Sequence, residues 1–550
     1  MVKRYLFLSV VFLTVVVLSG CSDHDDLVPP EEPTVQLDGF TDRVNTAEAG
    51  VVGIKGVPEN DSLVVKTRAV SDEYAANDLP MVMLAEVAPP TYEGVKLRAT
   101  HVDIEDGFAY VSYNVEGDTY LGAVDVIDIS DPESPAIVME AVFPGTDISS
   151  VTSRDNHLYV AGASENLHDG GENPALLMRM DMANGSLSDG MELIDMPGYV
   201  ATDVLLDDSY VYGVSGDDGV LASYNIADNS LVSQVQLPDL RALATLSGRL
   251  VVLSGSGRIY VFNPGTLTPV NDFPTLESNS ESKRTIALYL DEVFVAEGRQ
   301  GVGIYSLLTG SEDFRIPIIN SDETIDPDEL VTNAVSVSNG HIYIANGAGG
   351  ISVYGIPVEY SGLSSLTTVG TLDLDGSANY VVSKNGYVFV ADGTGGLKIL
   401  HLLAAPEENL CEGYDTYSGS YWLNVNSGEQ ATYSGVNTLV GINVNSNASL
   451  TFCGSLAVSN YIYVNSGGTF DMKGDLVQGS LATVGSQIVV NANATMRIEG
   501  NLTIYGNLIL NNRSTLEFVG DNSTLTVYGS VTRNNGSIIT GTYTDITGSL

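Results

Sequence analysis

Histidine and carboxylate side chains are the first places to look for chemistry in this chain of 550 residues. The sequence contains no HExxH zinc motif, no GxSxG nucleophile motif and no Gly-Lys phosphate loop. Its six histidines are scattered along the chain. His101 begins a strand of the first of several repeats described below, and this strand is predicted to face the centre around which the repeats are arranged. The same place in the other repeats is occupied by Ser150, Thr202, Ala242, Thr285, Ala334 and Tyr380. One histidine among mostly small residues does not make a metal site, so we expect His101 to be a polar lining residue, with ligand contact as the alternative.

Two aspartates in the segment TLDLDG are candidates for calcium binding. Asp373, Asp375 and Gly376 match part of a calcium loop, whose carboxylate oxygens suit this ion. The segment lacks an acid at the first loop position, and Val382 stands where the twelfth-position glutamate belongs. The sequence therefore predicts no metal and no cofactor, and it leaves calcium at Asp373 and Asp375 as the alternative.

Three further residues are candidates for contact with a ligand. His168 and Asp169 lie in the long hairpin ASENLHDGGENP (163–174), where a solvated loop is the alternative. The lone tryptophan, Trp422, can stack on a sugar or cap a core. The Gly-rich stretch DGTGG predicts only a hairpin turn, because Lys398 stands where a dinucleotide loop needs glycine and no helix follows.

The N-terminus predicts export and lipid attachment. Lys3 and Arg4 precede an apolar run from Tyr5 to Leu18, which is too short to span a membrane and suits a signal peptide over residues 1–20. The run ends in LSGC, which resembles the bacterial lipobox. This resemblance implies cleavage before Cys21 and acylation of its thiol and new amine, with palmitate among the acyl chains. The alternative is an ordinary secretory signal with a chance cysteine.

Acidic residues follow Cys21 directly. The sequence SDHDD resembles the surface-export signal of Bacteroidetes lipoproteins, which implies the outer face of the outer membrane; the start of an acidic linker is the alternative. In the same group of bacteria the tripeptide DSL would match an O-glycosylation motif, with Ser62 as the acceptor.

Acidic residues outnumber basic ones across the whole chain, 69 against 23, which gives a formal net charge of −46. Such a surface repels nucleic acid, so nucleic acid is not an expected partner. Because charged residues make up only 17% of the chain and hydrophobic residues 44%, the composition is that of a globular protein and not of a disordered acidic one.

Two cysteines remain beyond Cys21. Cys411 and Cys453 lie 42 residues apart, and an exported chain folds where disulfides persist. We expect a structural disulfide between them in preference to two free thiols. The absence of a CxxC motif gives no support to a redox or zinc role.

Short strands recur along residues 81–403. An aromatic or β-branched position repeats, in steps of 40 to 52 residues, at Tyr110, Tyr159, Val211, Val251, Phe294, Tyr343 and Phe389. Periods of this length are typical of a β-propeller, so the seven positions predict seven blades. The last blade ends near Leu403 without an outer strand, whereas MVMLAEV (81–87) has the character of one. We expect residues 81–87 to pair with the last blade and close the ring, because an open ring would expose strand edges.

Three repeats share a closely similar unit: VFVAEGRQGVGIY (293–305), IYIANGAGGISVY (342–354) and VFVADGTGGLKIL (388–400). Together with VIDISDPESP (126–135), the last of these resembles the LVIVD-repeat family over about residues 80–403. The resemblance implies a propeller on a bacterial surface protein. It implies no particular activity, because many members of the family have no assigned function.

Three other regions surround the predicted propeller. Residues 21–80, with the acidic PPEEP, predict a flexible tether, and residues 404–420 predict a polar linker. From 421 to 550, segments about 20 residues long begin with VNSGEQ, VNSNAS, VNSGGT, VNANAT and LNNRST. This period predicts a parallel β-solenoid whose recurring asparagines stack as an amide ladder; a small β-sandwich is the alternative.

These features together predict an all-β, non-catalytic lipoprotein that is anchored in the outer membrane, faces the exterior and binds a protein or glycan partner through its propeller. The loops at one mouth of the ring, with 163–174 first among them, are the expected binding surface. One alternative is a polysaccharide lyase or glycosidase, which requires His, Tyr, Arg or carboxylate side chains to converge in one mouth. The other is a structural component of an outer-membrane assembly.

Overall fold

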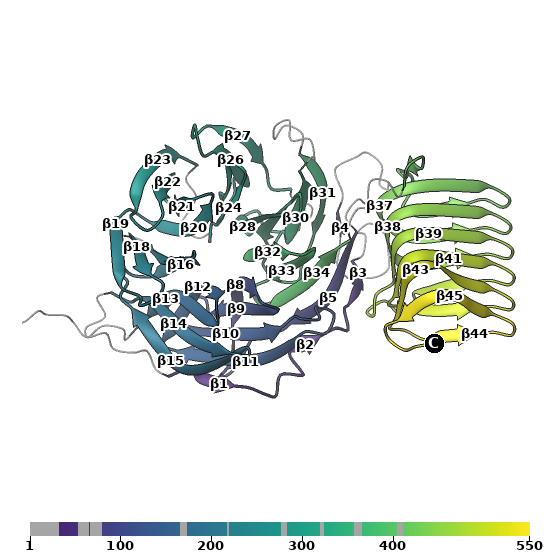
Figure 1. The fold of residues 1–550 in the computed structure, drawn as a ribbon, viewed down its shortest axis with the longest axis horizontal. Helices are drawn as coiled ribbons and strands as arrows, with labels where there is room; N and C mark the ends of the chain where they lie inside the picture. The colour runs from purple at the N-terminus through teal and green to yellow at the C-terminus, as the bar shows by residue number, and fades with distance from the viewer. Residues whose placement is uncertain are drawn as a thin grey trace, which may run out of the picture.

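Strands are the only regular elements in the part of the chain that the structure describes. The computed structural model describes residues 32–52, 65–66, 80–165, 173–216, 219–276, 283–319, 324–356, 366–403 and 411–550. Among these residues there is no helix long and apolar enough to cross a membrane. The strands form two bodies, a ring of blades and a stack of coils (Figure 1).

Seven antiparallel sheets form the ring, which confirms the predicted seven-bladed β-propeller. From the centre outward, blade one contains β8 (Arg98–Glu105), β9 (Phe108–Asn114), β10 (Leu121–Asp128) and β11 (Ala136–Pro144). Blade two contains β12 (Thr146–Arg154), β13 (His157–Ser164), β14 (Ala175–Ala183) and β15 (Ser186–Ile194). Blade three contains β16 (Ala201–Leu206), β17 (Tyr210–Ser215), β18 (Val220–Asn225) and β19 (Leu231–Gln236). Blade four contains β20 (Leu240–Leu246), β21 (Arg249–Ser254), β22 (Arg258–Asn263) and β23 (Thr268–Pro274).

The remaining blades repeat this plan. Blade five contains β24 (Ile286–Tyr289), β25 (Glu292–Ala296), β26 (Val302–Ser306) and β27 (Glu312–Ile316). Blade six contains β28 (Leu330–Ser338), β29 (His341–Gly347), β30 (Ile351–Gly355) and β31 (Thr367–Leu372). Apolar clusters fill the space between neighbouring blades: Val124 and Met139 of blade one, for example, share a buried cluster with Leu158 and Met178 of blade two. Burial of these side chains is what holds each blade against the next.

The last blade is completed by the first strand of the ring. Its inner strands are β32 (Tyr380–Lys384), β33 (Tyr387–Ala391) and β34 (Leu397–Leu402). Its outer strand is β5 (Met81–Val87), which pairs antiparallel with β34 from Leu397 opposite Val87 to Leu402 opposite Met81. A short hairpin of β6 (Thr91–Tyr92) and β7 (Val95–Lys96) then leads into blade one. The predicted closure of the ring by residues 81–87 is confirmed.

Residues 32–52, which were predicted to belong to the flexible tether, lie instead along the outer edge of the ring. β1 (Thr34–Gln36) pairs with β11, and both β2 (Val44–Asn45) and β3 (Gly50–Val51) pair with β5. Farther along the chain, β4 (Val65–Lys66) pairs with β31. The polar composition of this stretch was misleading because a few apolar residues, among them Phe40 and Val51, are buried in the core, and backbone hydrogen bonds and one ion cluster add to the attachment.

Arg43 is the centre of that ion cluster. Its guanidinium contacts the carboxylates of Asp125 and Glu140, and it donates two hydrogen bonds, of 2.9 and 2.8 Å, to the carbonyl oxygen of Ala88. The side chain of Asp125 is fully buried, so Arg43 supplies the counter-charge that burial of a carboxylate requires. The segment thus fastens β5 to blade one at the point where the ring closes.

The C-terminal body is a parallel β-solenoid, as the period near 20 residues predicts. Its strands are β35 (Asp415–Thr416), β36 (Trp422–Val425), β37 (Gln430–Val444), β38 (Ser449–Val464), β39 (Thr469–Gln478), β40 (Gln487–Val490), β41 (Thr495–Ile504), β42 (Asn507–Leu510), β43 (Thr515–Val527), β44 (Val531–Arg533) and β45 (Ile538–Asp545). Consecutive coils pair in parallel, for example β39 with β41 over ten residues. This pairing excludes the alternative of a β-sandwich, whose strands are antiparallel.

Two columns of residues run along the solenoid axis. The predicted amide ladder forms from the third coil onward: Asn534 donates to Asn511, Asn511 to Asn491 and Asn491 to Asn465, at 2.8 to 3.1 Å. Asn465 then donates to Asn443 at 2.8 Å, two residues before the equivalent position Asn445, so the first two coils depart from the prediction. A column of glycines lies at Gly435, Gly454, Gly474 and Gly500, all with φ between 113° and 137°. A Cβ on Gly474 would lie 2.2 Å from the carbonyl oxygen of Gly454, so only glycine fits between these coils.

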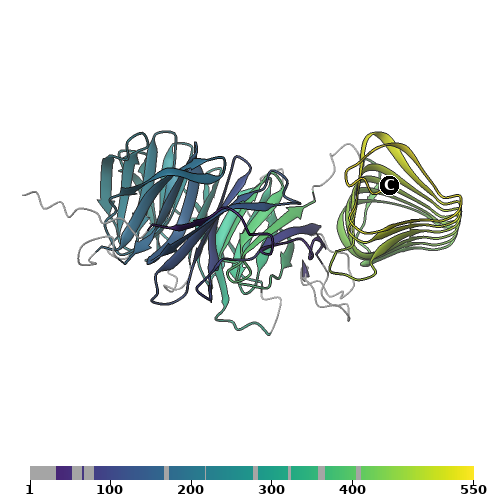
Figure 2. The ribbon, with the colours of Figure 1, turned by 90° about the horizontal axis from the view of Figure 1, so that it is seen from below.

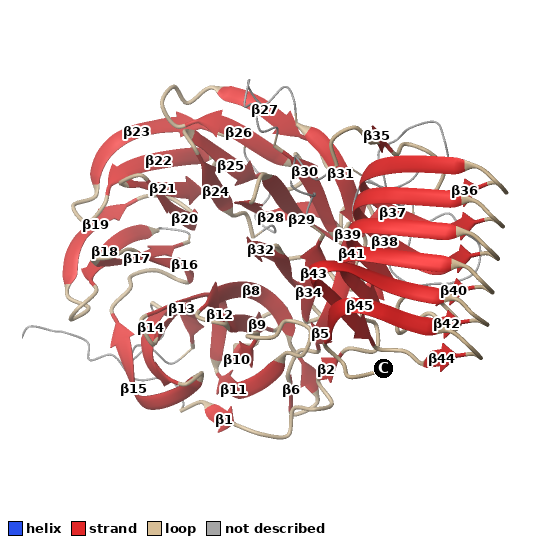
Figure 3. Ribbon diagram, turned by 45° about the vertical axis from the view of Figure 1, so that its right-hand side comes forward, coloured by secondary structure: helices blue, strands red, loops and turns tan. Residues whose placement is uncertain are grey.

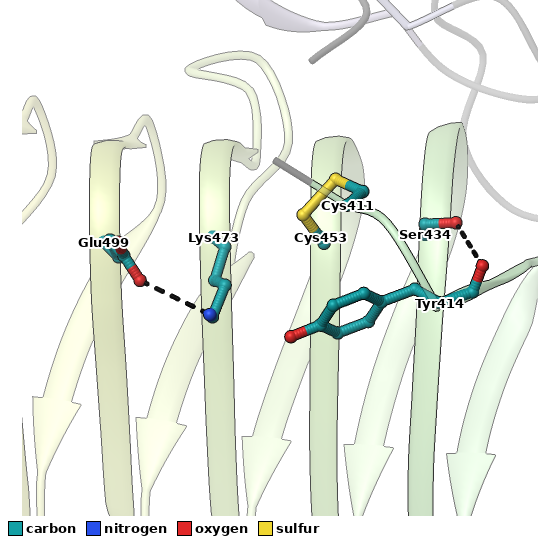
Figure 4. Close-up of a disulfide and its surroundings, with 6 residues drawn as sticks. All are labelled: Cys411, Tyr414, Ser434, Cys453, Lys473 and Glu499. Carbon is teal, nitrogen blue, oxygen red and sulfur yellow. Dashed lines mark hydrogen bonds and ion pairs between the residues drawn. A yellow bond between two sulfur atoms is a disulfide. The ribbon is translucent and has the colours of Figure 1, made fainter. Parts of the chain in front are cut away.

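A disulfide fastens the beginning of the solenoid. Cys411 and Cys453 are bonded, with their Cα atoms 5.5 Å apart, which confirms the predicted pair (Figure 4). The bond ties the chain before β35 to β38, where Cys453 is fully buried. Beside it, the hydroxyl of Ser434 donates to the carbonyl oxygen of Tyr414 at 3.3 Å. The part of the predicted linker 404–420 that begins at Cys411 is therefore already joined to the solenoid.

The solenoid lies beside the closing blade, as Figures 2 and 3 show from two directions. The amide of Val51 donates to the carbonyl oxygen of Gly479 at 2.8 Å, and the amide of Leu481 donates to that of Ala49 at 2.8 Å. Tyr505 shares a buried cluster with Leu84 of β5. The segment that fastens the ring therefore also holds the solenoid.

Candidate functional site

A pocket of about 370 Å³ lies at one mouth of the propeller channel. Its lining comes from all seven blades or the turns that lead into them: Arg98, Thr100, Asn114, Ser149, Val200, Thr202, Arg241, Lys283, Asn333 and Asn379. Most lining residues are polar, and they include three cationic side chains and three asparagine side chains. No carboxylate belongs to this set of described residues.

β-Bulges in the inner strands place four of the lining residues. In blade one, Ala99 and His101 pair with the second strand but Thr100 between them does not. The corresponding unpaired residues of blades two to four are Ser149, Thr202 and Arg241. A bulge turns one side chain away from the ladder and re-aims it. The same irregularity, repeated around the ring, therefore collects Thr100 and its three equivalents at the mouth.

The repeated Gly-rich hairpins position the neighbouring blades at this mouth. Gly298, Gly347 and Gly393, each with φ between 56° and 60°, form isolated bridges to the start of the next inner strand. Gly347 exchanges two hydrogen bonds with Ala378, at 3.1 and 2.9 Å, directly before the lining residue Asn379. The similar units noted in the sequence are thus joints between blades, and glycine is required because the left-handed conformation disfavours other residues.

Lining side chains also tie each blade to the next. The hydroxyl of Thr202 donates to the carbonyl oxygen of Leu240 at 2.9 Å. The amide of Asn333 donates to the carbonyl oxygen of Ala378 at 3.1 Å, and that of Asn379 to the carbonyl oxygen of Ala99 at 2.9 Å. These bonds hold the wall of the pocket in place before any ligand arrives, which lowers the ordering cost of binding.

Lys283 crosses the channel. Its Nζ donates to the carbonyl oxygens of Thr100 and Ser149, at 2.7 and 2.8 Å, in blades one and two, and it lies 5.2 Å from the ring centre of Tyr380. Burial lowers the pKa of Lys283 to about 7, and the nearby carboxylate of Asp203 opposes that shift. In its protonated form the ammonium has three N–H donors and two are committed, so one remains for a ligand.

The two arginines that line the pocket form ion pairs with carboxylates that do not line it. Arg98 forms an ion pair with Glu116, and Arg241 forms one of 2.7 Å with Asp239. Neither carboxylate belongs to the lining. Each guanidinium has five N–H donors, so one carboxylate contact leaves donors that can serve a ligand.

A second ring of side chains lies below the pocket and bonds to backbone amides. The amide of Val151 donates to Nδ1 of His101 at 3.5 Å, and the amide of Leu243 donates to Asp203 at 2.9 Å. The His101 ring lies 3.9 Å from that of Tyr380, and burial together with Lys283 holds the pKa of His101 well below its usual value. His101 is 7% exposed and does not belong to the pocket lining, and its Nδ1 accepts a hydrogen bond from blade two.

In blade three the structure places the channel-facing residue one position later than the sequence analysis predicted. His101, Ser150 and Ala242 are equivalent in the strand pairing, but the residue that shares their place is Asp203, because Thr202 lies in the bulge. The same shift makes Tyr212, in place of Val211, the equivalent of Tyr110. Blades one, two and four contain the same bulge, and both strands of blade three are shifted alike, so the prediction aligned the whole of blade three one residue too early.

The calcium candidates are placed at the edge of blade seven. Asp375 is exposed, and its carboxylate lies 3.9 Å from Nζ of Lys398. Lys398 is buried and pairs with Glu86 at 2.6 Å, so a lysine cation already occupies the acidic surroundings of Asp375. In the described part of the chain, His, Cys, Asp and Glu form no group of three or more that is arranged to hold a metal ion, and neither Asp373 nor Asp375 belongs to one.

Trp422 lies in the first coil of the solenoid. A Cβ on Gly441, its partner in the next coil, would lie 2.2 Å from the indole ring, so the ring covers that glycine closely. The ring is half-buried and lies against the edge of the solenoid core. The predicted positions Cys21, Ser62, His168 and Asp169 lie outside the described residues.

The sequence predictions missed the cations and amides of the pocket. Lys283, Arg241, Asn333 and Asn379 were not singled out, although most of them directly precede a residue of the predicted ring. The available signal was that a polar residue stands directly before the predicted channel-facing residue in several blades. Reading it required the bulges, which turn this position toward the mouth.

Comparisons with known proteins show similarity of fold alone. No protein-family model matches the chain, and no curated protein matches it. The WD40 propeller domain of Doa1 is similar at 13% identity, over 58% of this chain and 96% of that one, with a TM-score of 0.42. A chain of the mitotic checkpoint complex (13% identity, 64% and 100%, TM-score 0.40) and the designed protein Ika8 (14%, 57% and 98%, TM-score 0.37) are similar as well. Values this low transfer no property from these proteins.

Proposed function

We propose that this protein is a lipid-anchored surface lipoprotein that binds a partner non-catalytically, with the ligand held at the channel mouth of its propeller. The observation that carries the proposal is the pocket of about 370 Å³ to which all seven blades contribute polar side chains. A concave site with convergent polar groups is the ordinary form of a ligand site in proteins. Membrane attachment rests on the lipobox-like LSGC at Cys21 and on the acidic residues that follow it.

The binding proposal is tested by filling the pocket. The full-length chain in detergent is screened on a glycan array and in pull-downs, beside Thr202→Trp, which places an indole at the mouth. Thr268→Trp, on the exposed outer strand of blade four, is the matched control. We expect partners that are captured by the wild type and by the control to be lost with Thr202→Trp. Equal capture by all three proteins would show that the channel mouth is not the binding site.

The anchoring proposal has its own test. Metabolic labelling with palmitate should mark the wild type and not Cys21→Ala, and protease added to intact cells should cleave only the anchored protein. Labelling that persists in Cys21→Ala would contradict the proposal.

One observation favours a lyase as a second candidate: His101 and Tyr380 are in contact below the pocket, and Lys283, which lines the pocket, lies over the Tyr380 ring. Two such groups could exchange a proton with a substrate. The bond from the Val151 amide to His101 argues for a structural role of this histidine. Incubation with acidic polysaccharides distinguishes the two functions, because a lyase shortens the polymer and creates an unsaturated product that absorbs ultraviolet light.

A further inference from the structure

The charge of the pocket contrasts with the charge of the chain. The chain carries a formal net charge of −46, with only 23 basic residues, yet Arg98, Arg241 and Lys283 gather around one pocket without a lining carboxylate. A cationic wall in an acidic protein attracts a negatively charged group to this place and repels it elsewhere.

The charge balance of the pocket limits how much negative charge it takes. Arg98 is paired with Glu116 and Arg241 with Asp239, and Lys283 interacts with buried Asp203. These three carboxylates offset most of the positive charge of the cations. The pocket wall therefore offers N–H donors without a large net positive charge. Such a site suits one carboxylate in preference to a polyanion, because guanidinium and amine donors match carboxylate oxygens directly.

The rest of the wall is suited to a sugar ring. Amides and hydroxyls surround the cations, and these groups form hydrogen bonds with sugar hydroxyls. Tyr199 is 58% exposed and directly precedes Val200, which lines the pocket. Tyr199 itself does not belong to the lining, but an exposed aromatic residue one position from a lining residue is the available apolar surface on which the face of a sugar could stack.

We propose that the channel mouth binds the carboxylate of an acidic sugar residue, with Lys283 and Arg241 as its donors and Tyr199 against the sugar ring. This inference rests on the proposed function of the same pocket. A pocket of about 370 Å³ accommodates a ligand of one or two sugar rings, so an acidic end or side residue of a glycan is the fitting class.

Calorimetry with three matched trisaccharides tests the ligand class: a hexuronate, its carboxyl-reduced neutral counterpart and a sulfated neutral one. The full-length chain in detergent is compared with Lys283→Gln, Tyr199→Ala and the control Lys473→Gln, which removes one lysine from the solenoid. We expect the hexuronate to bind at least about tenfold more tightly than the other two sugars. Lys283→Gln should remove that preference, Tyr199→Ala should weaken all sugars alike, and Lys473→Gln should change nothing.

Three results would overturn the inference. Equal affinity for acidic and neutral sugars, or tighter binding of the sulfated sugar, would refute a carboxylate site. Unchanged binding by Lys283→Gln would refute the assigned donor, and Lys283→Arg, which keeps the charge, separates loss of the donor from loss of folding. If no sugar binds while Thr202→Trp still abolishes capture of another partner, the acidic-sugar inference falls and the proposed function stands.

Discussion

The ring and the solenoid are both built from repeats of short strands, but they differ in how their ends are treated. The ring joins its two ends, because β5 from the start of the fold pairs with β34 at its end. In the solenoid each coil pairs only with its neighbours, and among the described strands β45 pairs only with β43. Damage to a closed ring is therefore shared by all blades, whereas damage to a solenoid stays near its origin. Closure also brings all seven blades to one pocket at the channel mouth.

Removal of the closing strand should have the largest effect. Deletion of residues 81–87 opens the ring and exposes the edge of β34, so we expect hydrogen-exchange protection to fall in all seven blades while β37 to β43 stay protected. Deletion of β45, residues 538–545, is the matched experiment in the solenoid, and it should reduce protection only around β43. Retained protection in blades two to five after the first deletion would refute the shared closure.

Arg43→Ala should be the most damaging single substitution on the outer edge of the ring. It leaves the buried carboxylate of Asp125 without its partner, a loss of about 3–5 kcal/mol in the free energy of unfolding. Arg258→Ala removes an exposed ion pair with Asp272 in blade four and should cost less than about 1 kcal/mol. Denaturant unfolding of the propeller measures both, and similar losses for the two variants would contradict the role given to Arg43.

Loss of the disulfide should be smaller and confined to the solenoid. Replacement of both Cys411 and Cys453 by alanine releases a loop of 42 residues and should lower stability by about 2–4 kcal/mol. The first coils should exchange faster while the propeller is unchanged. Accelerated exchange in the blades would show that the two bodies are more strongly coupled than the comparison implies.

The amide ladder should give the smallest effect. Asn491→Ala removes one rung between Asn465 and Asn511, with an expected loss of about 1–3 kcal/mol because a neighbouring amide loses its partner. Asn426→Ala is the control, since its side chain contacts only Glu429 at the exposed start of the solenoid. A thermal melt that follows the solenoid signal should separate the two variants, and an equal shift would mean that the ladder adds no stability.

The sequence was most informative where structure repeats. The seven blades, closure by 81–87, the solenoid, its asparagine ladder and the disulfide all follow from period, strand character and cysteine count. The attachment of residues 32–52 was not predictable from composition, because its partners lie far along the chain: Arg43 meets carboxylates 82 and 97 residues away, and Phe40 and Val51 share a buried cluster with Tyr505. Arg43 is nevertheless the only Lys or Arg between Cys21 and Ile54, and a single cation in an acidic stretch was the available sign.

The pocket was predicted less well than the fold. Lys283 reaches the carbonyl oxygen of Thr100, 183 residues away, and no periodic pattern encodes such a contact. The bulged lining residues lie one position before the expected channel-facing residues, and in blade three the channel-facing residue is Asp203, one position later than predicted. Strand periodicity therefore predicts which blade a residue belongs to, but irregularities in the strands decide which side chain lines the pocket.

The pH dependence of hexuronate binding tests the central claim, a carboxylate site built around Lys283, most directly. The groups that face Lys283 are Asp203, Tyr380 and His101, and its pKa lies at about 7. Lysine is charged below its pKa, so the wild-type dissociation constant should rise by up to about tenfold between about pH 6 and about pH 8, while Lys283→Gln binds weakly at both. An affinity that is unchanged across this range, or wild-type affinity in Lys283→Gln, would contradict the account.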